Sequence, residues 1–388
     1  MPVINRVAEL AEEVAQWRRR LHENPEILYE VHETAAFVAD KLRSFGVDEV
    51  VTGIGRTGVV GVIKGARPGS GKTIALRADM DALPIHEETD LPYKSKTPGA
   101  MHACGHDGHT AMVLGAAKYL AETRNFAGNA VVVFQPAEEG GNGALAMIED
   151  GLMDRFGVDE VYGLHNDPTM EIGKFGIRPG AQQASMDKFT ITISGKGSHG
   201  ATPHLSIDPI FIASQTVSAL QSIASRNVDP LDSIVVSVCM MEAGSAFNII
   251  PQTAKLTGTV RTLSESAHDL AEQRMKEICA GLAMSFGASL DVDYWRGTPV
   301  LVNDADKTAF AVRVAREVAG ESNVNPNATQ IMGGEDFAFM LNSRPGAFIF
   351  MGNGLGPYCH HPAYNFSDEA IPYGVSYFVR LVETASAA

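Results

Sequence analysis

Short, continuous runs of apolar residues alternate with amphipathic stretches along the first half of the chain. Such runs begin at Val59, Thr73, Ala130 and Val158, and a later one begins at Gly346. Continuous apolar runs are typical of strands that are buried on both faces of a sheet covered by helices. Apolar positions at helical spacing recur in residues 7–17 and 37–45. The pattern predicts an α/β fold with a helix-covered mixed sheet.

The stretch from residue 185 to residue 296 has a different pattern. Polar and apolar residues alternate in the segment that starts at Asp187, as in a strand with one solvated face. Helical and extended patterns follow in the order β-α-β-β-α-β, which is that of a ferredoxin-like unit. We therefore expect a discontinuous larger domain, 1–184 and 297–388, around an inserted α+β domain, 185–296.

Composition limits the classes of function. The chain has 388 residues, a formal net charge of −15 and 45% hydrophobic residues, so it can bury a large core and form more than one domain. The acidic balance argues against nucleic acid or an anionic membrane as the partner, and no apolar run is long enough to span a bilayer. The N-terminal residues lack the apolar stretch of a signal peptide, and 4 cysteines give no disulfide framework. We expect a cytoplasmic protein with free thiols.

Ligand-type side chains follow the predicted buried strands. They are Asp79 and Asp81, Glu138 and Glu139, His165 and Asn166, and His360 and His361. In an open α/β sheet, ligands bind outside the carboxyl ends of the strands, so these side chains can converge there. Asp, Glu and His at several strand ends indicate a metal centre.

The densest cluster of such residues is the segment HACGHDGHTAM, which begins at His102. We interpret Cys104 and His106 as metal ligands, because thiolate and imidazole hold divalent transition metals. A buried, inert thiol is the alternative for Cys104. Asp107 and His109 fit better as groups that cap and orient the start of the following helix. A place directly behind the metal ligands is the alternative for His109.

Glu138 and Glu139 are adjacent carboxylates. On a regular strand they would point to opposite faces. Both reach one site only at the end of the strand, where Gly140 and Gly141 permit a turn. One glutamate can then bind metal while the other takes a proton from bound water. A solvated acidic loop is the alternative.

Three residues of the inserted segment are weaker candidates. His199 lies in a glycine-rich loop, Asn248 in the loop FNIIP, and Arg261 in a strand. Taken alone, they fit better as a surface histidine, a turn residue and an exposed arginine than as functional groups. We assign no catalytic or metal-binding role to the following cysteines and histidines. We interpret Cys239 and Cys279 as buried inert thiols. We interpret four histidines as surface or structural residues: His22, His32, His86 and His268.

Together, these segments resemble the dinuclear-metal peptidase and aminoacylase superfamily. The branch is that of hippurate hydrolases, N-acyl-amino-acid amidohydrolases and hydrolases of indole-3-acetyl-amino-acid conjugates. The matching stretches, in the family's order, are RRxLHxxPE, RADMDALPI, HACGHDGHTAM, FQPAEEG, GLHN, GKGSHGATPH, FNIIP, GGEDFAF and HHPAYNFSDEAIP. The resemblance implies a zinc-peptidase-like catalytic domain for two divalent ions, and an inserted domain that serves as lid and dimer interface.

The resemblance also implies roles for individual residues. Cys104 bridges the two ions, and the other ligands are His106 and His165 for one ion and Glu139 and His360 for the other. The sequence CHH at 359–361 leaves open a shift of the ligand to His361, and Cys359 departs from the aliphatic residue usual there. Asp79 and Asp81 lie behind the ligands.

By the same resemblance, Glu138 is the general base and then the acid that protonates the departing amine. His199, supplied by the lid of a partner subunit in a homodimer or homotetramer, stabilises the oxyanion. Arg261, with Asn248 nearby, is the candidate that binds the free carboxylate of the substrate.

The implied reaction is hydrolysis of an N-acyl amino acid to a carboxylic acid and a free amino acid. Hippurate, N-acetyl amino acids, indole-3-acetyl conjugates and N-acetyl-diaminopimelate all fit, and zinc, manganese, nickel or cobalt fits the ligands. Two other hypotheses remain open. One is a hydrolase with Cys104 as nucleophile, and the other is a non-catalytic binding protein that has kept the fold.

Overall fold

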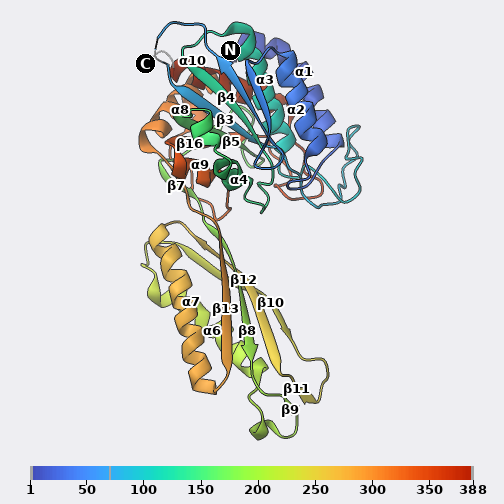
Figure 1. The fold of residues 1–388 in the computed structure, drawn as a ribbon, viewed down its shortest axis with the longest axis vertical. Coiled ribbons are helices and arrows are strands. Elements are labelled where there is room, and N and C mark those ends of the chain that lie inside the picture. Colours follow the sequence, from blue (N-terminus) through green and yellow to red (C-terminus); the bar gives the residue numbers. More distant parts are fainter. Residues whose placement is uncertain (1–2, 70, 386–388) are drawn as a thin grey trace. The chain divides into compact units, whose positions relative to one another are not determined.

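The computed structural model describes residues 3–69 and 71–385. They divide into two compact units (Figure 1), which are described separately. The larger unit comprises Met1–Gly180, Val302–Thr329 and Asp336–Ala388, and the inserted unit comprises Ala181–Leu301 and Gln330–Glu335.

A mixed sheet forms the centre of the larger unit. Its strands are β1 (Glu49–Ile54), β2 (Gly58–Lys64), β3 (Thr73–Asp79), β4 (Asn129–Gln135), β5 (Glu160–Asp167), β6 (Phe175–Gly176), β15 (Val324–Asn325) and β16 (Gly346–Gly352). Within the described residues the sheet is eight-stranded, in the order β1-β2-β4-β3-β5-β16-β6-β15. The central strands β4, β3, β5 and β16 are parallel, so their carboxyl ends meet at one edge.

Helices cover both faces of this sheet (Figure 1). They are α1 (Asn5–Glu23), α2 (His32–Ser44), α3 (His106–Thr123), α4 (Gly143–Glu149), α5 (Leu152–Arg155), α8 (Ala305–Ala319), α9 (Phe337–Ser343) and α10 (Ile371–Ala385). Helices α2, α3, α8 and α10 pack on one face, and α1 packs over α3 and α10. The short helices α4 and α9 pack on the other. The predicted helix-covered α/β sheet is confirmed.

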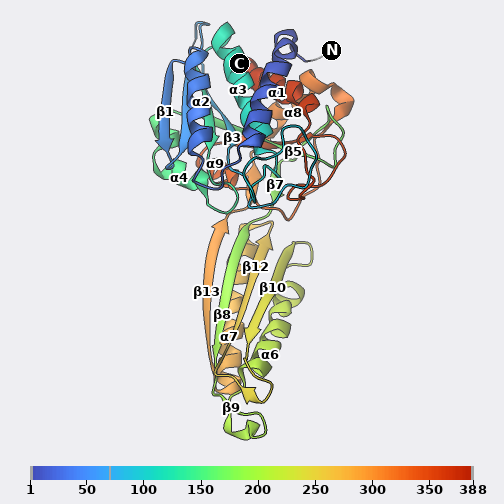
Figure 2. The ribbon, with the colours of Figure 1, turned by 90° about the vertical axis from the view of Figure 1, so that its right-hand side faces the viewer.

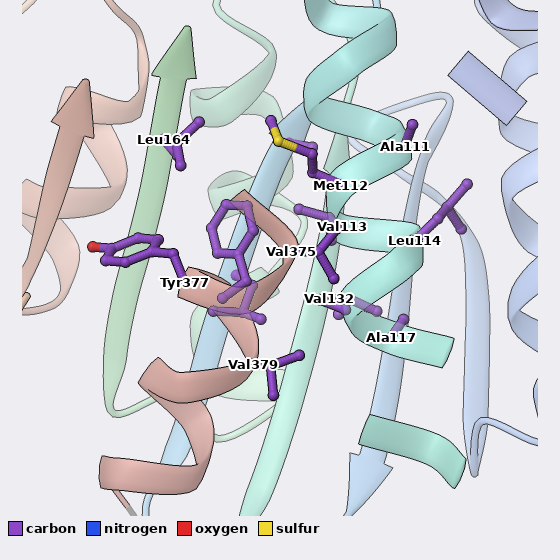
Figure 3. Close-up of a cluster of buried hydrophobic side chains, with 14 of the residues drawn as sticks. Ala111, Met112, Val113, Leu114, Ala117, Val132, Leu164, Val375, Tyr377 and Val379 are labelled. Atoms are coloured by element: carbon purple, nitrogen blue, oxygen red, sulfur yellow. The ribbon is translucent and has the colours of Figure 1, made fainter. Parts of the chain in front are cut away.

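Helix α3 is the most deeply buried helix of the core and carries His106 at its first residue. Figure 3 shows Met112 and Val113 of α3 beside Val375 of α10 and Val132 of β4. All of these side chains are buried, and burial of each contributes about 1.5–3 kcal/mol to the stability of the folded state. Gly374 allows α10 to approach this closely, because a Cβ there would collide with Met112. Packing therefore fixes the start of α3.

The inserted unit is a second α+β layer structure (Figure 2). Its main elements are β8 (Met186–Ser194), β10 (Ile234–Ala243), β12 (Thr253–Thr262), β13 (Ser289–Thr298), α6 (Pro209–Ser222) and α7 (Glu265–Phe286). As far as the chain is described, the strands form a four-stranded antiparallel sheet in the order β10-β12-β8-β13, with both helices on one face. This is the predicted ferredoxin-like arrangement. The short strands β9 (Ser198–His199) and β11 (Ile249–Ile250) also belong to this unit. The short strands β7 (Gly180–Gln183) and β14 (Leu301–Asn303) each contain a point at which the chain passes from one unit to the other.

Two features of the inserted unit differ from the sequence-based expectations. The segment Gln330–Glu335 packs in this unit rather than in the larger one, since Ala184 donates its N–H to the Gly333 carbonyl at 3.0 Å. Cys239 is exposed, whereas Cys279 is buried as predicted. Cys239 is the additional residue of a bulge in β10, where the pairing with β12 shifts, and this exposes its side chain.

No helix in the described part of the chain combines the length and the apolar character needed to cross a membrane.

Candidate metal centre

The carboxyl ends of the parallel strands and the start of α3 converge on one group of ligand-type side chains. Ligand atoms of Cys104, His106 and His165 lie within 4.8 Å of one another, and so do those of Cys104, Glu139 and His360. The Cys104 sulfur is 3.3 Å from His165 Nε2, and Glu139 Oε1 is 3.3 Å from His360 Nε2. The structure thus brings together the residues that the sequence nominates as ligands.

The two histidines nearest Cys104 are anchored through their Nδ1 atoms. His106 Nδ1 lies 2.8 Å from the Asp81 carbonyl oxygen, and His165 Nδ1 lies 2.6 Å from that of Asn166. A carbonyl can only accept, so Nδ1 is the protonated nitrogen of each neutral ring, and Nε2 is the nitrogen that can bind a metal. Metal-binding histidines have this arrangement.

Some buried polar atoms of the group make no hydrogen bond. Within residues 3–69 and 71–385, His106 Nε2 has no hydrogen-bond partner, and Glu139 Oε1 has only the 3.3 Å ion-pair contact with His360 Nε2, which lacks hydrogen-bond geometry. Buried polar atoms without a partner are rare in proteins. A divalent cation would satisfy both, and sulfur, nitrogen and carboxylate oxygen are suitable ligands for zinc and its neighbours. The residues present therefore fit a metal.

A sharp turn after β4 brings Glu138 and Glu139 to the same place. Ala137 and Gly140 have positive φ angles of 54° and 89°. Asp81 holds the turn, because its two carboxylate oxygens accept the N–H groups of Glu138 and Glu139 at 3.0 and 3.1 Å. Ligand atoms of His106, Glu138 and Glu139 lie within 4.8 Å of one another. The turn expected from the sequence is present.

The electrostatics of this group favour a cation. Burial alone lowers the pKa of His106, but the carboxylates of Asp79, Asp81 and Glu139 raise it well above its usual value. Burial raises the pKa of Glu139, but His360 and His106 hold it below its usual value. Carboxylates thus outweigh desolvation around His106, and a metal ion would benefit from the same field.

The thiols of Cys104 and Cys359 interact with each other. Hydrogen bonding to Cys359, followed by burial, raises the pKa of Cys104 well above its usual value. Hydrogen bonding to Cys104 lowers the pKa of Cys359 to about 7. Cys104 therefore holds its proton more tightly than Cys359. A bound metal would instead favour the thiolate of Cys104, because a coordinating thiol is deprotonated.

The backbone distinguishes His360 from His361. His360 adopts a φ of 68°, and its N–H donates to the Ala103 carbonyl at 2.7 Å, which brings its side chain to Glu139. The side chain of His361 instead accepts the N–H of Ala363 at 3.0 Å. The geometry thus favours His360 as the ligand.

The candidates of the inserted unit lie at two separate places. Strand β9 pairs with β11, with His199 opposite Ile249, and Gly200 donates its N–H to the Asn248 carbonyl at 2.8 Å. His199 and Asn248 are therefore neighbours, and both are exposed. Arg261 is eight residues beyond the start of β12, or about 26 Å along an extended strand. The expectation that Asn248 lies near Arg261 is thus wrong within one chain.

Arg261 is a half-buried guanidinium without a hydrogen-bond partner among the described residues. Burial lowers its pKa, and the nearby charge of Asp187 opposes that effect. The site is kept open by Gly334, since a Cβ there would lie 3.2 Å from Arg261 Nη1. A half-buried cation that lacks a partner is suited to an anionic ligand.

The family described as "Peptidase family M20/M25/M40" matches residues 75–384. The chain belongs to this family. A hippurate hydrolase from Campylobacter jejuni is 45% identical over 381 residues, which are 98% of each chain. An N-acetyl-L-cysteine deacetylase from Bacillus subtilis is 43% identical over 93% of this chain and 85% of its own. The solved structure of a dinuclear metal binding peptidase of the M20 family, also from Bacillus subtilis, has a TM-score of 0.85 at 35% identity and covers 98% of this chain and 99% of its own.

In this member of the M20/M25/M40 peptidase family, the prediction that Asp107 and His109 cap α3 is wrong. The residue before α3 is Gly105, and no side chain caps the helix. Asp107 instead accepts a hydrogen bond from His22 at 2.9 Å, and His109 donates to Asp79 at 2.7 Å. Both side chains are fully buried and support the segment that carries the ligands.

The same region contains a charged cluster that the sequence does not reveal. His22 and Arg18 are buried with Asp107 and Glu87, and Arg18 pairs with Asp368 at 2.7 Å. The only available signal is helical spacing, because Arg18 and His22 continue the buried row of Val14 on α1. Of the other histidines, His268 is structural, 2.6 Å from Asp187, and His32 and His86 are exposed.

Proposed function

We propose that the protein is a metal-dependent amidohydrolase that cleaves N-acyl amino acids to a carboxylic acid and a free amino acid. The position of Glu138 carries this proposal, because its carboxylate shares a 4.8 Å cluster with His106 and Glu139 beside the other candidate ligands. A protein that only binds metal or substrate needs no base there. The activities named for the hippurate hydrolase and the N-acetyl-L-cysteine deacetylase support the same reaction class.

We propose two divalent ions per subunit. Cys104 belongs to both ligand groups, one with His106 and His165 and the other with Glu139 and His360, as a bridging thiolate requires. The dinuclear character named for the related M20 structure supports this number. A mixed set of sulfur, nitrogen and oxygen suits zinc, and manganese, nickel and cobalt are the alternatives.

Such ions supply Lewis acidity, which polarises an amide carbonyl and lowers the pKa of water. Glu138 accepts the proton of the attacking water and delivers it to the departing amine. Asp81 keeps the Glu138 backbone in place through the hydrogen bond to its N–H. A displaced Glu138 carboxylate could no longer reach the proton of the attacking water. The turn after β4 is therefore part of the catalytic arrangement.

Arg261 binds the free carboxylate of the substrate in this proposal. His199 and Asn248 act on the substrate from a partner subunit, because within one chain they lie far from Arg261 along the inserted sheet. We therefore propose a homodimer, or a homotetramer built from it, that forms through the inserted unit. Exposed apolar side chains on the edge strand β10, Met240 and Met241, support an interface there.

The cysteine-nucleophile alternative is not favoured by the structure. A nucleophilic cysteine needs a lowered thiol pKa, whereas that of Cys104 is raised. A ligand thiol must also stay reduced, which is consistent with our proposal of a cytoplasmic enzyme.

The proposal is tested by a hydrolysis screen on metal-loaded protein. Benzoyl-glycine, N-acetyl-cysteine, indole-3-acetyl-amino acids and N-acetyl-diaminopimelate are each compared with the analogue whose α-carboxylate is converted to an amide. We expect release of amino acid from at least one of the carboxylates and much slower release from its amide. Absence of product from every N-acyl amino acid would overturn the proposal.

A further inference from the structure

A buried chain of hydrogen bonds lies directly behind the candidate metal centre. It runs from Arg77 through Asp79, His109 and Asn166 to Tyr364, and all of these side chains are buried. Arg77 Nη1 donates to Asp79 Oδ2 at 2.7 Å, and Asp79 Oδ1 accepts from His109 Nδ1 at 2.7 Å. These hydrogen bonds therefore connect the centre of the sheet with Asn166, the residue that follows the proposed ligand His165.

Asn166 joins the two segments that present Cys104 and His165. Its side-chain Nδ2 donates to the Cys104 carbonyl at 2.6 Å, and its Oδ1 accepts from the Tyr364 hydroxyl at 2.6 Å. The Cys104 carbonyl can only accept, so the orientation of the amide is fixed. The residue after His165 is thus tied to the backbone of Cys104.

His109 holds the other side of Asn166. Its Nε2 accepts the backbone N–H of Asn166 at 3.1 Å and lies 3.1 Å from Asn166 Nδ2. Nε2 is therefore unprotonated, and the proton on Nδ1 is the one donated to Asp79. The His109 ring also packs against that of His165, with centroids 4.8 Å apart and planes at 66°. His109 consequently fixes both the backbone and the ring of the neighbouring ligand.

Gly105 shows how closely these groups approach. Its φ is 92°, and a Cβ at this position would collide with Asn166 Nδ2 and lie 2.5 Å from the Tyr364 hydroxyl. Only glycine allows the ligand segment Cys104–His106 to lie against the amide. The contact is therefore built into the backbone rather than formed by flexible side chains.

We propose that Asn166, His109 and Tyr364 are positioning residues that set the separation of Cys104 and His165, and with it the affinity and geometry of the metal that these two residues hold. This inference rests on the metal centre of the proposed function. It assigns the hydrogen-bonded amide, rather than packing alone, as the cause of the 3.3 Å distance between the Cys104 sulfur and His165 Nε2. Partners of this kind typically change metal affinity by about 10–100-fold when they are removed.

The test compares Tyr364→Phe with Tyr377→Phe. Both tyrosines are fully buried, but the Tyr377 hydroxyl makes no hydrogen bond to the described residues, so its removal is a matched control. The Co²⁺ affinity of the metal-free protein is measured by competition with a chelator, together with the absorption spectrum of bound Co²⁺. Asn166→Ala is measured in the same way, and circular dichroism establishes that each variant is folded.

We expect Asn166→Ala to bind Co²⁺ about 10–100-fold more weakly than the unsubstituted protein, with an altered Co²⁺ spectrum. Tyr364→Phe should shift both readouts in the same direction, and Tyr377→Phe should shift neither. Unchanged affinity and spectrum in Tyr364→Phe overturn the proposal, even where Asn166→Ala fails to fold. Equal losses in both Tyr variants also overturn it. These readouts need no turnover: failure to hydrolyse N-acyl amino acids would reject the proposed function but not the positioning roles.

Discussion

Replacing His22 by alanine is expected to destabilise the larger unit by about 3 kcal/mol. His22 Nδ1 lies 2.9 Å from Asp107 Oδ2, its Nε2 lies 3.4 Å from Glu87 Oε1, and the side chains are at most 1% exposed. Removing one partner of a buried ion pair typically costs about 3–5 kcal/mol. Arg18 Nη1 stays 3.6 Å from Asp107, so the lower end of this range applies.

The pH dependence of this loss follows from the pKa of His22. Burial lowers that pKa, but hydrogen bonds to Asp107 and Glu87 raise it from 6.5 to about 9. A difference of this size corresponds to about 3 kcal/mol. Because the folded pKa lies above the unfolded one, the stabilisation is complete below pH 6.5 and is lost as the pH rises to about 9. The deficit of His22→Ala should therefore be largest at low pH.

The assay is urea unfolding at pH 6 and pH 9.5, followed by tryptophan fluorescence. The chain has 2 tryptophans, so a Trp295→Phe background leaves Trp17, which lies on the same helix as His22, as the reporter of the larger unit. His32→Ala is the control, because His32 is 66% exposed and pairs with Glu30 at 3.3 Å in solvent. We expect no measurable change for the control. A loss below about 1 kcal/mol at pH 6, or equal losses at both pH values, would refute the reasoning.

Three further predictions concern the substrate site and the metal. Arg261→Met should raise KM for an N-acyl amino acid by about 10–100-fold, as loss of a charged hydrogen-bonded pair predicts, and steady-state kinetics with the carboxyl-amide analogue should show no such change. Gly334→Ala should raise KM by up to about tenfold with little effect on kcat, because its Cβ would displace the guanidinium, whereas Gly281→Ala, where a Cβ meets nothing within 4 Å, should match the unsubstituted protein. Chelator treatment should abolish hydrolysis, and added Zn²⁺ or Co²⁺ should restore it; activity that survives removal of all bound metal would contradict the metal assignment.

The fold could be predicted from the sequence because burial leaves a direct pattern. Strands β3, β4, β5 and β16 are buried on both faces and read as continuous apolar runs, whereas β8 alternates. The exposure of Cys239 could not be predicted from this pattern, because it depends on a one-residue bulge. The return of Gln330–Glu335 to the inserted unit depends on long-range backbone pairing, which leaves no periodicity.

The candidate site was predictable only as far as strand ends imply a common edge. His360, rather than His361, faces Glu139 because His360 has a positive φ angle. This conformation is uncommon for residues other than glycine, so the sequence gives no signal for it. His22 pairs with Asp107 and Glu87, which are far from it along the chain. The sequence therefore left open whether His22 is a surface or a structural residue. The separation of Asn248 from Arg261 likewise follows from strand length rather than residue type.

The central claim is that Glu138 is a base beside a centre of two metal ions, and one preparation of Glu138→Gln tests it most directly. Bound metal is counted by elemental analysis, and hydrolysis of an accepted N-acyl amino acid is measured on the same sample. We predict two ions per subunit, as in the unsubstituted protein, with turnover reduced by about 10²–10⁴-fold. Full activity in this variant, or a loss of activity that is explained by loss of metal, would contradict the account.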